Sequence, residues 1–320
     1  MKVFIAFIFT LTNFHSVYSF GDPLPALHLS QMESFDRYFV SIDVNGAFVR
    51  EYRYEYLYDS YDNTVGKQIT YDNRNYYLLR PNLELGISRG RMKGFIYYKG
   101  VSDFNYRYEK IVYTPGYVPQ DTLRIERKGD IYAVGLRASL DFGNFTVGGG
   151  LALLNKTVVS TETRTLSPEV LFCYRGKHEG VGGSVSPKVK FSEESDYSIP
   201  DKISLFTYYQ PPSRTLAKFE FSFYYLNFSG LEDTLEDYYK GQLSVTHTFR
   251  DRTTLKMGGL LEKGFEGNYY APGFEIGLGY LLDPFELGVR FNETFYNYYR
   301  DGMLIEESPL KVDVYFRVLK

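Results

Sequence analysis

The sequence contains no tryptophan, only one cysteine and, after residue 20, no long apolar segment. A single cysteine excludes an intramolecular disulfide, so Cys173 is expected to be a small structural residue without a redox role. A membrane-spanning helix needs about 18 apolar residues, and no later segment approaches that length. The formal net charge of −3 offers no concentrated basic face, which excludes a nucleic-acid partner.

Residue patterns typical of catalytic and metal sites are absent too. The four histidines are scattered without zinc-ligand spacing, so no metal and no cofactor are expected. His247 invites comparison with membrane-embedded lipid hydrolases, but no serine or acid accompanies it on the same strand face. The sequence therefore predicts no catalytic residue and no enzyme activity. Gly148-Gly149-Gly150 lacks the Lys-Ser/Thr of a phosphate-binding loop and is expected to permit bending or leave room for bulky neighbours.

Aromatic residues are abundant: the chain has 32 tyrosines and 26 phenylalanines. Aromatic rings with one polar end gather at membrane interfaces, so this excess indicates aromatic girdles. The mean hydropathy is nevertheless negative, at −0.29. A transmembrane β-barrel reconciles the two observations, because only alternate residues of each strand meet lipid.

The N-terminus has the features of an export signal. Lys2 precedes an apolar stretch from Val3 to Leu11, and Val17-Tyr18-Ser19 is a plausible cleavage site. We therefore expect a signal peptide at residues 1–19, a short periplasmic segment at 20–37 and a barrel at 38–320. This organisation places the protein in the outer membrane of a Gram-negative cell.

Six short turns separate stretches in which apolar and polar residues alternate. Apolar residues at every second position form one face of a strand, which suits lipid on one side and a lumen on the other. The turns lie at Arg89-Gly90-Arg91, Gly143-Asn144, Gly176 to Gly180, Gln210 to Arg214, Arg250-Asp251-Arg252 and Asp283-Pro284. Together with a first and a last strand they predict an all-β, antiparallel up-and-down barrel of about 14 strands, with 12–16 as the open range.

The other connections are expected to be long, polar and extracellular. Asp59 to Asn75 and Glu109 to Lys128 are the two longest, and either could fold inward. Extra hairpins above the membrane are an alternative at Glu109 to Lys128 and at Lys156 to Leu166. A soluble exported β-sandwich would also show alternation, but its dry core would leave many tyrosine hydroxyls without partners.

One region resembles a known family. The stretch from Ile199-Pro200 to Tyr208-Tyr209-Gln210-Pro211, followed by the aromatic strand Phe219 to Tyr225, is similar to the long-chain fatty acid transporter family of outer-membrane proteins. The resemblance covers about residues 130 to 300 and implies a 14-stranded barrel that takes up hydrophobic solutes. That family also carries an N-terminal hatch with an Asn-Pro-Ala-type motif. Residues 20–37 contain no such motif, so a reduced or missing plug is expected.

Charged residues on the polar faces are the candidate transport path, because charges on the lipid face cost up to about 2–4 kcal/mol near the midplane. They either line a selective pore or pair with one another and fill the lumen. These residues are Asp43, Glu51, Arg80, Glu84, Arg137, Asp141, Lys188, Lys190, Glu286 and Arg290.

The function expected from the sequence is a channel or passive transporter for small solutes, with apolar solutes as one option. The alternative is a structural barrel with a blocked lumen, whose extracellular loops bind partners. The expected partners are outer-membrane lipid, a small-molecule solute and the barrel assembly machinery, and the protein is expected to be a monomer.

Overall fold

The computed structural model describes residues 37–319, except 59, 62, 79–80, 104–105, 115–117, 128, 159–160, 192–197, 213–216, 228–236, 250–251, 264–268 and 301–302. The predicted signal peptide and nearly all of the predicted periplasmic segment lie outside these residues and stay predictions. Among the described residues, no helix is long and apolar enough to cross a membrane.

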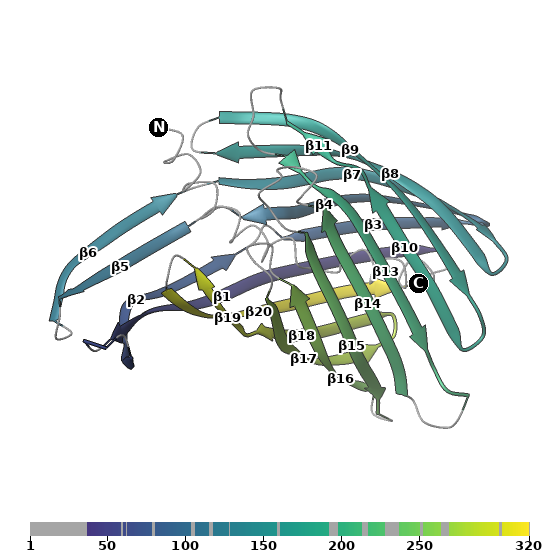
Figure 1. Cartoon of the computed structure of the whole chain (residues 1–320). Helices are drawn as coiled ribbons and strands as arrows, with labels where there is room; N and C mark the ends of the chain where they lie inside the picture. Colours follow the sequence, from purple (N-terminus) through teal and green to yellow (C-terminus); the bar gives the residue numbers. More distant parts are fainter. Residues whose placement is uncertain are drawn as a thin grey trace.

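The described chain folds into one closed antiparallel barrel (Figure 1). Its first strand, β1 (Tyr38–Tyr58), pairs with its last, β20 (Met303–Leu319), from Phe39↔Leu319 to Glu55↔Met303. Between them lie β2 (Thr64–Leu78), β3 (Asn82–Arg89), β4 (Met92–Asp103), β7 (Gly129–Phe142), β8 (Phe145–Val158), β9 (Thr161–Arg175), β10 (Glu179–Ser186), β13 (Asp201–Tyr209), β14 (Ala217–Asn227), β15 (Tyr238–Thr248), β16 (Thr253–Lys263), β17 (Tyr270–Leu282), β18 (Phe285–Thr294) and β19 (Tyr296–Arg300). Closure removes the exposed edges that an open sheet would present.

The predicted strand number is confirmed. β2 with β3, and β18 with β19, each make one interrupted strand, so the sixteen segments of the sheet form fourteen barrel strands. All six predicted short turns join neighbouring barrel strands. Gly90 and Gly143 adopt φ of 64° and 69°, a backbone region in which glycine carries no steric cost.

The interruption between β2 and β3 occurs at Pro81. Asp43 pairs with Asn82 and Gly46 pairs with Leu78, so three residue steps along β1 oppose four along its partner. One extra residue is the geometry of a β-bulge, and proline suits it because proline has no backbone N–H for the ladder.

Two of the predicted long connections differ from the structure. The loop predicted at Asp59 to Asn75 is wrong, because β2 starts at Thr64 and pairs with β1 along 46–58. A strand can continue through polar residues, so polarity alone misplaced the end of the strand. At Glu109 to Lys128 the alternative of an extra hairpin is confirmed: β5 (Tyr106–Thr114) pairs with β6 (Val118–Arg127). Figure 1 shows this hairpin extending from the barrel end opposite the short turns.

The connection at Lys156 to Leu166 is also mostly strand. At Lys156 to Leu166, β8 continues to Val158 and β9 begins at Thr161, so the two pair almost to their tips. Long strands here extend the wall away from the short turns.

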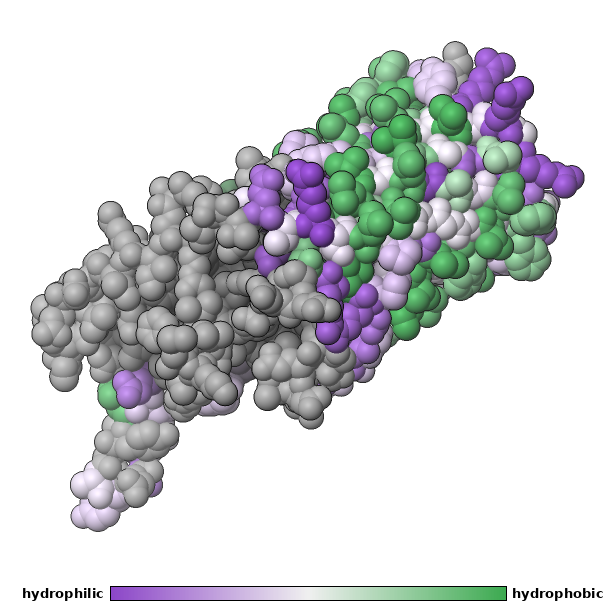
Figure 2. Space-filling model, turned by 90° about the horizontal axis from the view of Figure 1, so that it is seen from above, coloured by the Kyte–Doolittle hydropathy of each residue, from purple (hydrophilic) through white to green (hydrophobic). Residues whose placement is uncertain are grey.

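Apolar side chains cover the outside of the barrel. On β7 the even-numbered residues from Val134 to Phe142 are exposed while Ala133, Arg137 and Ser139 are buried. Leu136 is 61% exposed. Figure 2 shows these hydrophobic side chains as a band with hydrophilic residues on either side. A soluble sandwich would bury this face, whereas the barrel turns it outward.

Glycine lets a large ring lie flat against the inner wall. A Cβ at Gly135 would lie 2.3 Å from Cζ of Tyr97 on the neighbouring strand. The Tyr97 ring also packs against the guanidinium of Arg137, 4.5 Å away, so it has little freedom to move. Gly135→Ala should therefore lower the free energy of unfolding by about 1–3 kcal/mol, the cost of overpacking.

Chemical unfolding in detergent, followed by circular dichroism, measures this loss. Gly241→Ala is the matched control, because a Cβ at Gly241 meets nothing within 4 Å. Adding Tyr97→Ala to Gly135→Ala should restore part of the loss. Equal losses of unfolding free energy in the Gly135→Ala and Gly241→Ala variants would contradict the close contact between position 135 and the Tyr97 ring.

Candidate functional site

The inner face of the barrel carries buried charges in pairs. Arg137 on β7 donates through Nε to Oε2 of Glu169 on β9 at 2.9 Å, and its Nη1 lies 3.9 Å from Oε1 of Glu84 on β3. Both partners are buried with it. Each charge is compensated by an opposite one, which offsets part of the cost of burial.

The Arg137–Glu169 pair is possible because the residue between them, Gly150, has no side chain. Gly150 on β8 lies in register between them, opposite Arg137 on one side and Glu169 on the other. A Cβ at Gly150 would lie 2.8 Å from Cγ of Arg137. The arginine therefore lies across β8 to reach a strand two positions away. The expectation that the glycine triplet leaves room for a bulky neighbour holds at this position.

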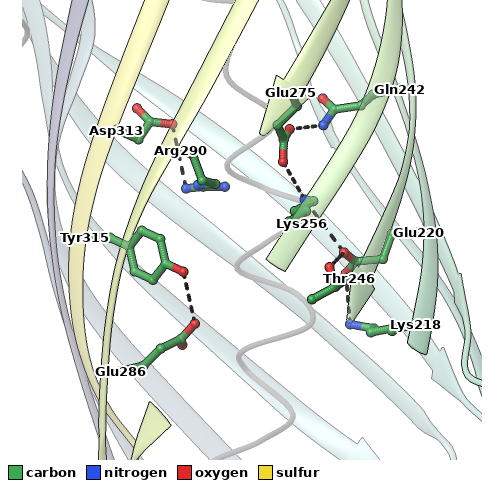
Figure 3. A network of polar contacts seen from close by, with 10 residues as sticks. All are labelled: Lys218, Glu220, Gln242, Thr246, Lys256, Glu275, Glu286, Arg290, Asp313 and Tyr315. Atoms are coloured by element: carbon green, nitrogen blue, oxygen red, sulfur yellow. Dashed lines mark hydrogen bonds and ion pairs between the residues drawn. The ribbon is translucent and has the colours of Figure 1, made fainter. Parts of the chain in front are cut away.

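A second network follows the opposite part of the wall (Figure 3). Glu220 on β14 accepts from Lys218 at 2.9 Å and from Thr246 at 3.1 Å. Nζ of Lys256 lies 3.7 Å from Glu220 and 3.0 Å from Glu275. Glu275 also accepts a hydrogen bond from the Gln242 amide. Acidic and basic side chains thus alternate across β14 to β17.

The network continues across the seam where the first and last strands meet. Arg290 lies 3.8 Å from Asp313, and Arg317 lies 3.5 Å from Glu286 and 4.0 Å from Asp43. The Tyr315 ring is between the two arginines, with cation–π distances of 5.3 and 4.2 Å. These contacts neutralise the charge of the lumen wall from one strand to the next.

The half of the lumen away from the short turns, called the loop end here, is lined with apolar and aromatic groups. One cluster is formed by Tyr224, Leu226, Tyr238, Ala271, Tyr296, Tyr298 and Ile305. Across the lumen a second cluster contains Tyr97, Ile131, Ala133, Ala152, Leu154, Val189 and Phe191. A third, nearer the short turns, contains Phe39, Phe95, Leu171, Cys173 and Phe206. The lumen therefore offers apolar surface at both ends of a charged middle.

Part of the second cluster comes from a segment that leaves the wall. We call residues 187–191 and 198–200, which join β10 to β13, the inner arm. Within it β11 (Val189–Lys190) pairs with β12 (Ser198–Ile199). Val189 and Phe191 are 5% and 7% exposed, in contact with inward-facing wall residues.

A cavity of about 110 Å³ lies between the inner arm and the wall. Its apolar lining includes Ala133, Ala152 and Leu154, and its polar side includes Arg137 and Glu169. Lys99 and Lys202 also line it, so the cavity combines apolar and charged surface. This cavity is the candidate site for a small solute.

The structure places most of the predicted path residues on the inner wall. Asp43, Glu51, Glu84 and Arg137 are buried there, and Asp141, Glu286 and Arg290 are partly buried with ion-pair partners. Glu51 pairs with Arg53 at 2.6 Å, and Asp141 with Lys93 at 3.3 Å. Arg80 lies outside the described residues. Whether these groups form a transport path stays a prediction.

The structure corrects the predicted positions of Lys188 and Lys190. The sequence assigned both to the inner face of a wall strand, with Val189 and Phe191 facing lipid. The wall strand β10 ends at Ser186 instead, because Pro187 has no N–H for the ladder. Both lysines belong to the inner arm, where Lys190 is exposed and the apolar side chains are buried.

Several inner charges were missed by sequence reasoning: Lys93, Glu169, Lys202, Lys240, Glu262 and Glu275. Glu275 could have been found, since Phe274, Ile276 and Leu278 alternate around it with period two. Lys240 and Glu262 are 2.8 Å apart, and Tyr296 also donates to Glu262. The two residues are 22 positions apart in sequence and meet only because β15 pairs with β16 in this register. Periodicity along a single strand does not show such pairing.

The described residues contain no group of three or more His, Cys, Asp or Glu side chains able to hold a metal ion. His247 lies beside Phe249, with ring centroids 4.6 Å apart, near the turn between β15 and β16.

Comparison with solved structures identifies barrels of the same fold. The toluene transporter TodX of P. putida matches with a TM-score of 0.65 at 7% identity, covering 94% of this chain and 93% of that one. The monoaromatic hydrocarbon channel CymD gives 0.65 at 8%, covering 95% and 93%. A Pseudomonas aeruginosa FadL homologue gives 0.63 at 10%, covering 88% and 90%. Neither a protein-family model nor a curated protein matches the sequence. At these identities the similarity establishes the fold alone, which is the 14-strand barrel that the sequence resemblance implied.

Proposed function

We propose that this barrel is a passive outer-membrane channel for small apolar solutes. The apolar lining at the loop end of the lumen, with its cavity, is the observation that carries this function. Apolar surface inside a barrel binds apolar molecules by removing both from water. The names of similar structures, a toluene transporter and a monoaromatic hydrocarbon channel, support the same solute class.

The paired charges suit this role better than ion conduction. An ion-selective pore presents a ring of unpaired charge of one sign. Here both signs alternate and compensate each other, as in the Glu220–Lys256–Glu275 series. The charged middle of the lumen therefore offers little net field to an ion. Nothing in this mechanism requires an energy source, so the direction of flux follows the concentration gradient.

The location and partners follow from the same proposal. The short turns face the periplasm, the loop end faces the exterior, and outer-membrane lipid surrounds the exposed apolar band. Tyr98 and Tyr132, with ring centroids 5.5 Å apart, would belong to the outer aromatic girdle. We propose a monomer that is inserted by the barrel assembly machinery.

Filling the cavity tests the solute site. Ser167 on β9 lines the cavity and is half-buried, so a larger side chain has room to enter it. Ser167→Phe should reduce the flux of an apolar fluorescent dye into proteoliposomes several-fold, because the ring occupies the solute's space. The neighbouring outward residue gives the control: Leu166→Phe, on the outer face of β9, should leave flux unchanged. Equal fluxes for both variants and the wild type would remove the cavity from the path.

The second candidate function is a structural barrel with a blocked lumen, favoured by the paired charges and by the inner arm. Flux of the apolar dye separates the two proposals. A folded barrel that passes neither dye nor ions in planar bilayers would support the structural role.

A further inference from the structure

The inner arm contributes apolar side chains to the lumen. Its strand β11 points Val189 and, just beyond it, Phe191 toward the wall, while Lys190 points away. Tyr97, Ala133, Ala152 and Leu154 form the surface that receives them, which we call the apolar ledge. These four residues come from β4, β7 and β8, so the ledge belongs to the barrel and exists independently of the arm.

Polar contacts fix the arm where it leaves the wall. The backbone N–H of Lys188 donates to Oδ1 of Asp201 at 2.5 Å, and Asn227 donates to the other carboxylate oxygen of Asp201 at 3.2 Å. Pro200 is almost fully buried. The buried ring of Phe191 lies 5.3 Å from the Lys156 ammonium, a cation–π contact. The ends of the arm are thus anchored, and its apolar side chains are held by packing.

The ledge also lines the cavity. Ala133, Ala152 and Leu154 border it on the wall side, and Pro187, Ile199 and Pro200 of the arm border it on the other. Val189 and Phe191 pack on the same ledge residues that border the cavity. The arm and the solute therefore compete for one surface.

We infer that the inner arm is a self-occluding gate: its Val189 and Phe191 occupy the apolar ledge in place of the solute and are displaced when the solute binds. This inference rests on the proposed function. A ligand whose site is open only part of the time binds with an apparent affinity reduced by that fraction. Removing the competing side chain should therefore strengthen apparent binding.

Thiol accessibility tests the displacement. In a Cys173→Ser background, which removes the chain's own thiol, Val189→Cys places a thiol on the ledge and Lys190→Cys places one on the exposed side of the same strand. In proteoliposomes, a water-soluble maleimide should label position 190 quickly at all times. Position 189 should react slowly alone and several-fold faster when an apolar single-ring solute such as toluene is added. An unchanged rate at 189, with normal labelling at 190, overturns the gate.

Flux supplies a second readout that does not use thiols. Phe191→Ala should lower the half-saturating concentration of the apolar dye several-fold, whereas Lys190→Ala should leave it unchanged. Heat-modifiable mobility on gels confirms that both variants are folded. If the wild type carries the dye and Phe191→Ala has the same half-saturating concentration, the gate is wrong but the proposed channel function is supported. If folded wild type and Phe191→Ala both fail to carry it, the proposed function fails and the gate falls with it.

Discussion

Arg137→Met is expected to lower the free energy of unfolding by about 3–5 kcal/mol, the usual cost of removing one partner from a buried ion pair. The methionine keeps much of the side-chain volume over Gly150 but leaves Glu169 and Glu84 without their common cation. Both carboxylates are buried, at 9% and 4% exposed, so water compensates them poorly. Because the chain has no tryptophan, circular dichroism during urea unfolding in detergent is the suitable measurement.

A double variant shows where that cost arises. Arg137→Met with Glu169→Gln should recover a large part of the lost stability, since the amide needs no counter-charge. The exposed pair of Arg164 and Glu162, 3.8 Å apart on β9, gives the control. Arg164→Met should change stability by less than about 1 kcal/mol, as surface pairs do. A loss from Arg137→Met no larger than this control would mean that water fills the lumen and screens the charges.

Leu136→Arg has the second-largest expected effect. Leu136 lies near the middle of the outer face of β7, so arginine there should cost about 2–4 kcal/mol if acyl chains surround it. Unfolding from lipid vesicles of defined thickness measures this cost. The change adds a charge without altering the lumen, because neighbouring Gly135 and Arg137 point inward.

Depth dependence distinguishes lipid from other causes. Phe142 lies on the same face of the same strand, next to the turn at Gly143, where the membrane meets water. Phe142→Arg should cost only about 0–1 kcal/mol, because arginine reaches the headgroup region there. If the two substitutions cost the same, the apolar band is not a membrane belt. Localisation to the outer membrane would then lose its main physical support.

The inner wall combines paired charges with apolar surface. Charged side chains pair across neighbouring strands, which fixes the register of the barrel and removes net charge from the lumen. Between and beyond these pairs, aromatic and aliphatic groups provide apolar surface. A barrel that relied on apolar filling alone would leave no path, and one with unpaired charges would attract ions.

The barrel itself could be predicted from the sequence, because its main signals are local. Side chains alternate with period two along each strand, so Leu136 and Arg137 are assigned to opposite faces without knowledge of any neighbour. Short turns are equally local, since Gly143-Asn144 requires a positive φ that glycine adopts without strain. These two signals determined the strand number, the outer face and most of the inward charges.

The contents of the lumen were decided only by the tertiary structure. Glu169 meets Arg137 because Gly150 lies between them in register, and register across strands is not written in the period of any one strand. The inner arm begins at Pro187. The alternation of valine and lysine continues after this residue, but the chain has left the wall. The same alternating residues then face a ledge instead of lipid, because burial depends on which surface lies opposite. Only the closed barrel supplies that surface.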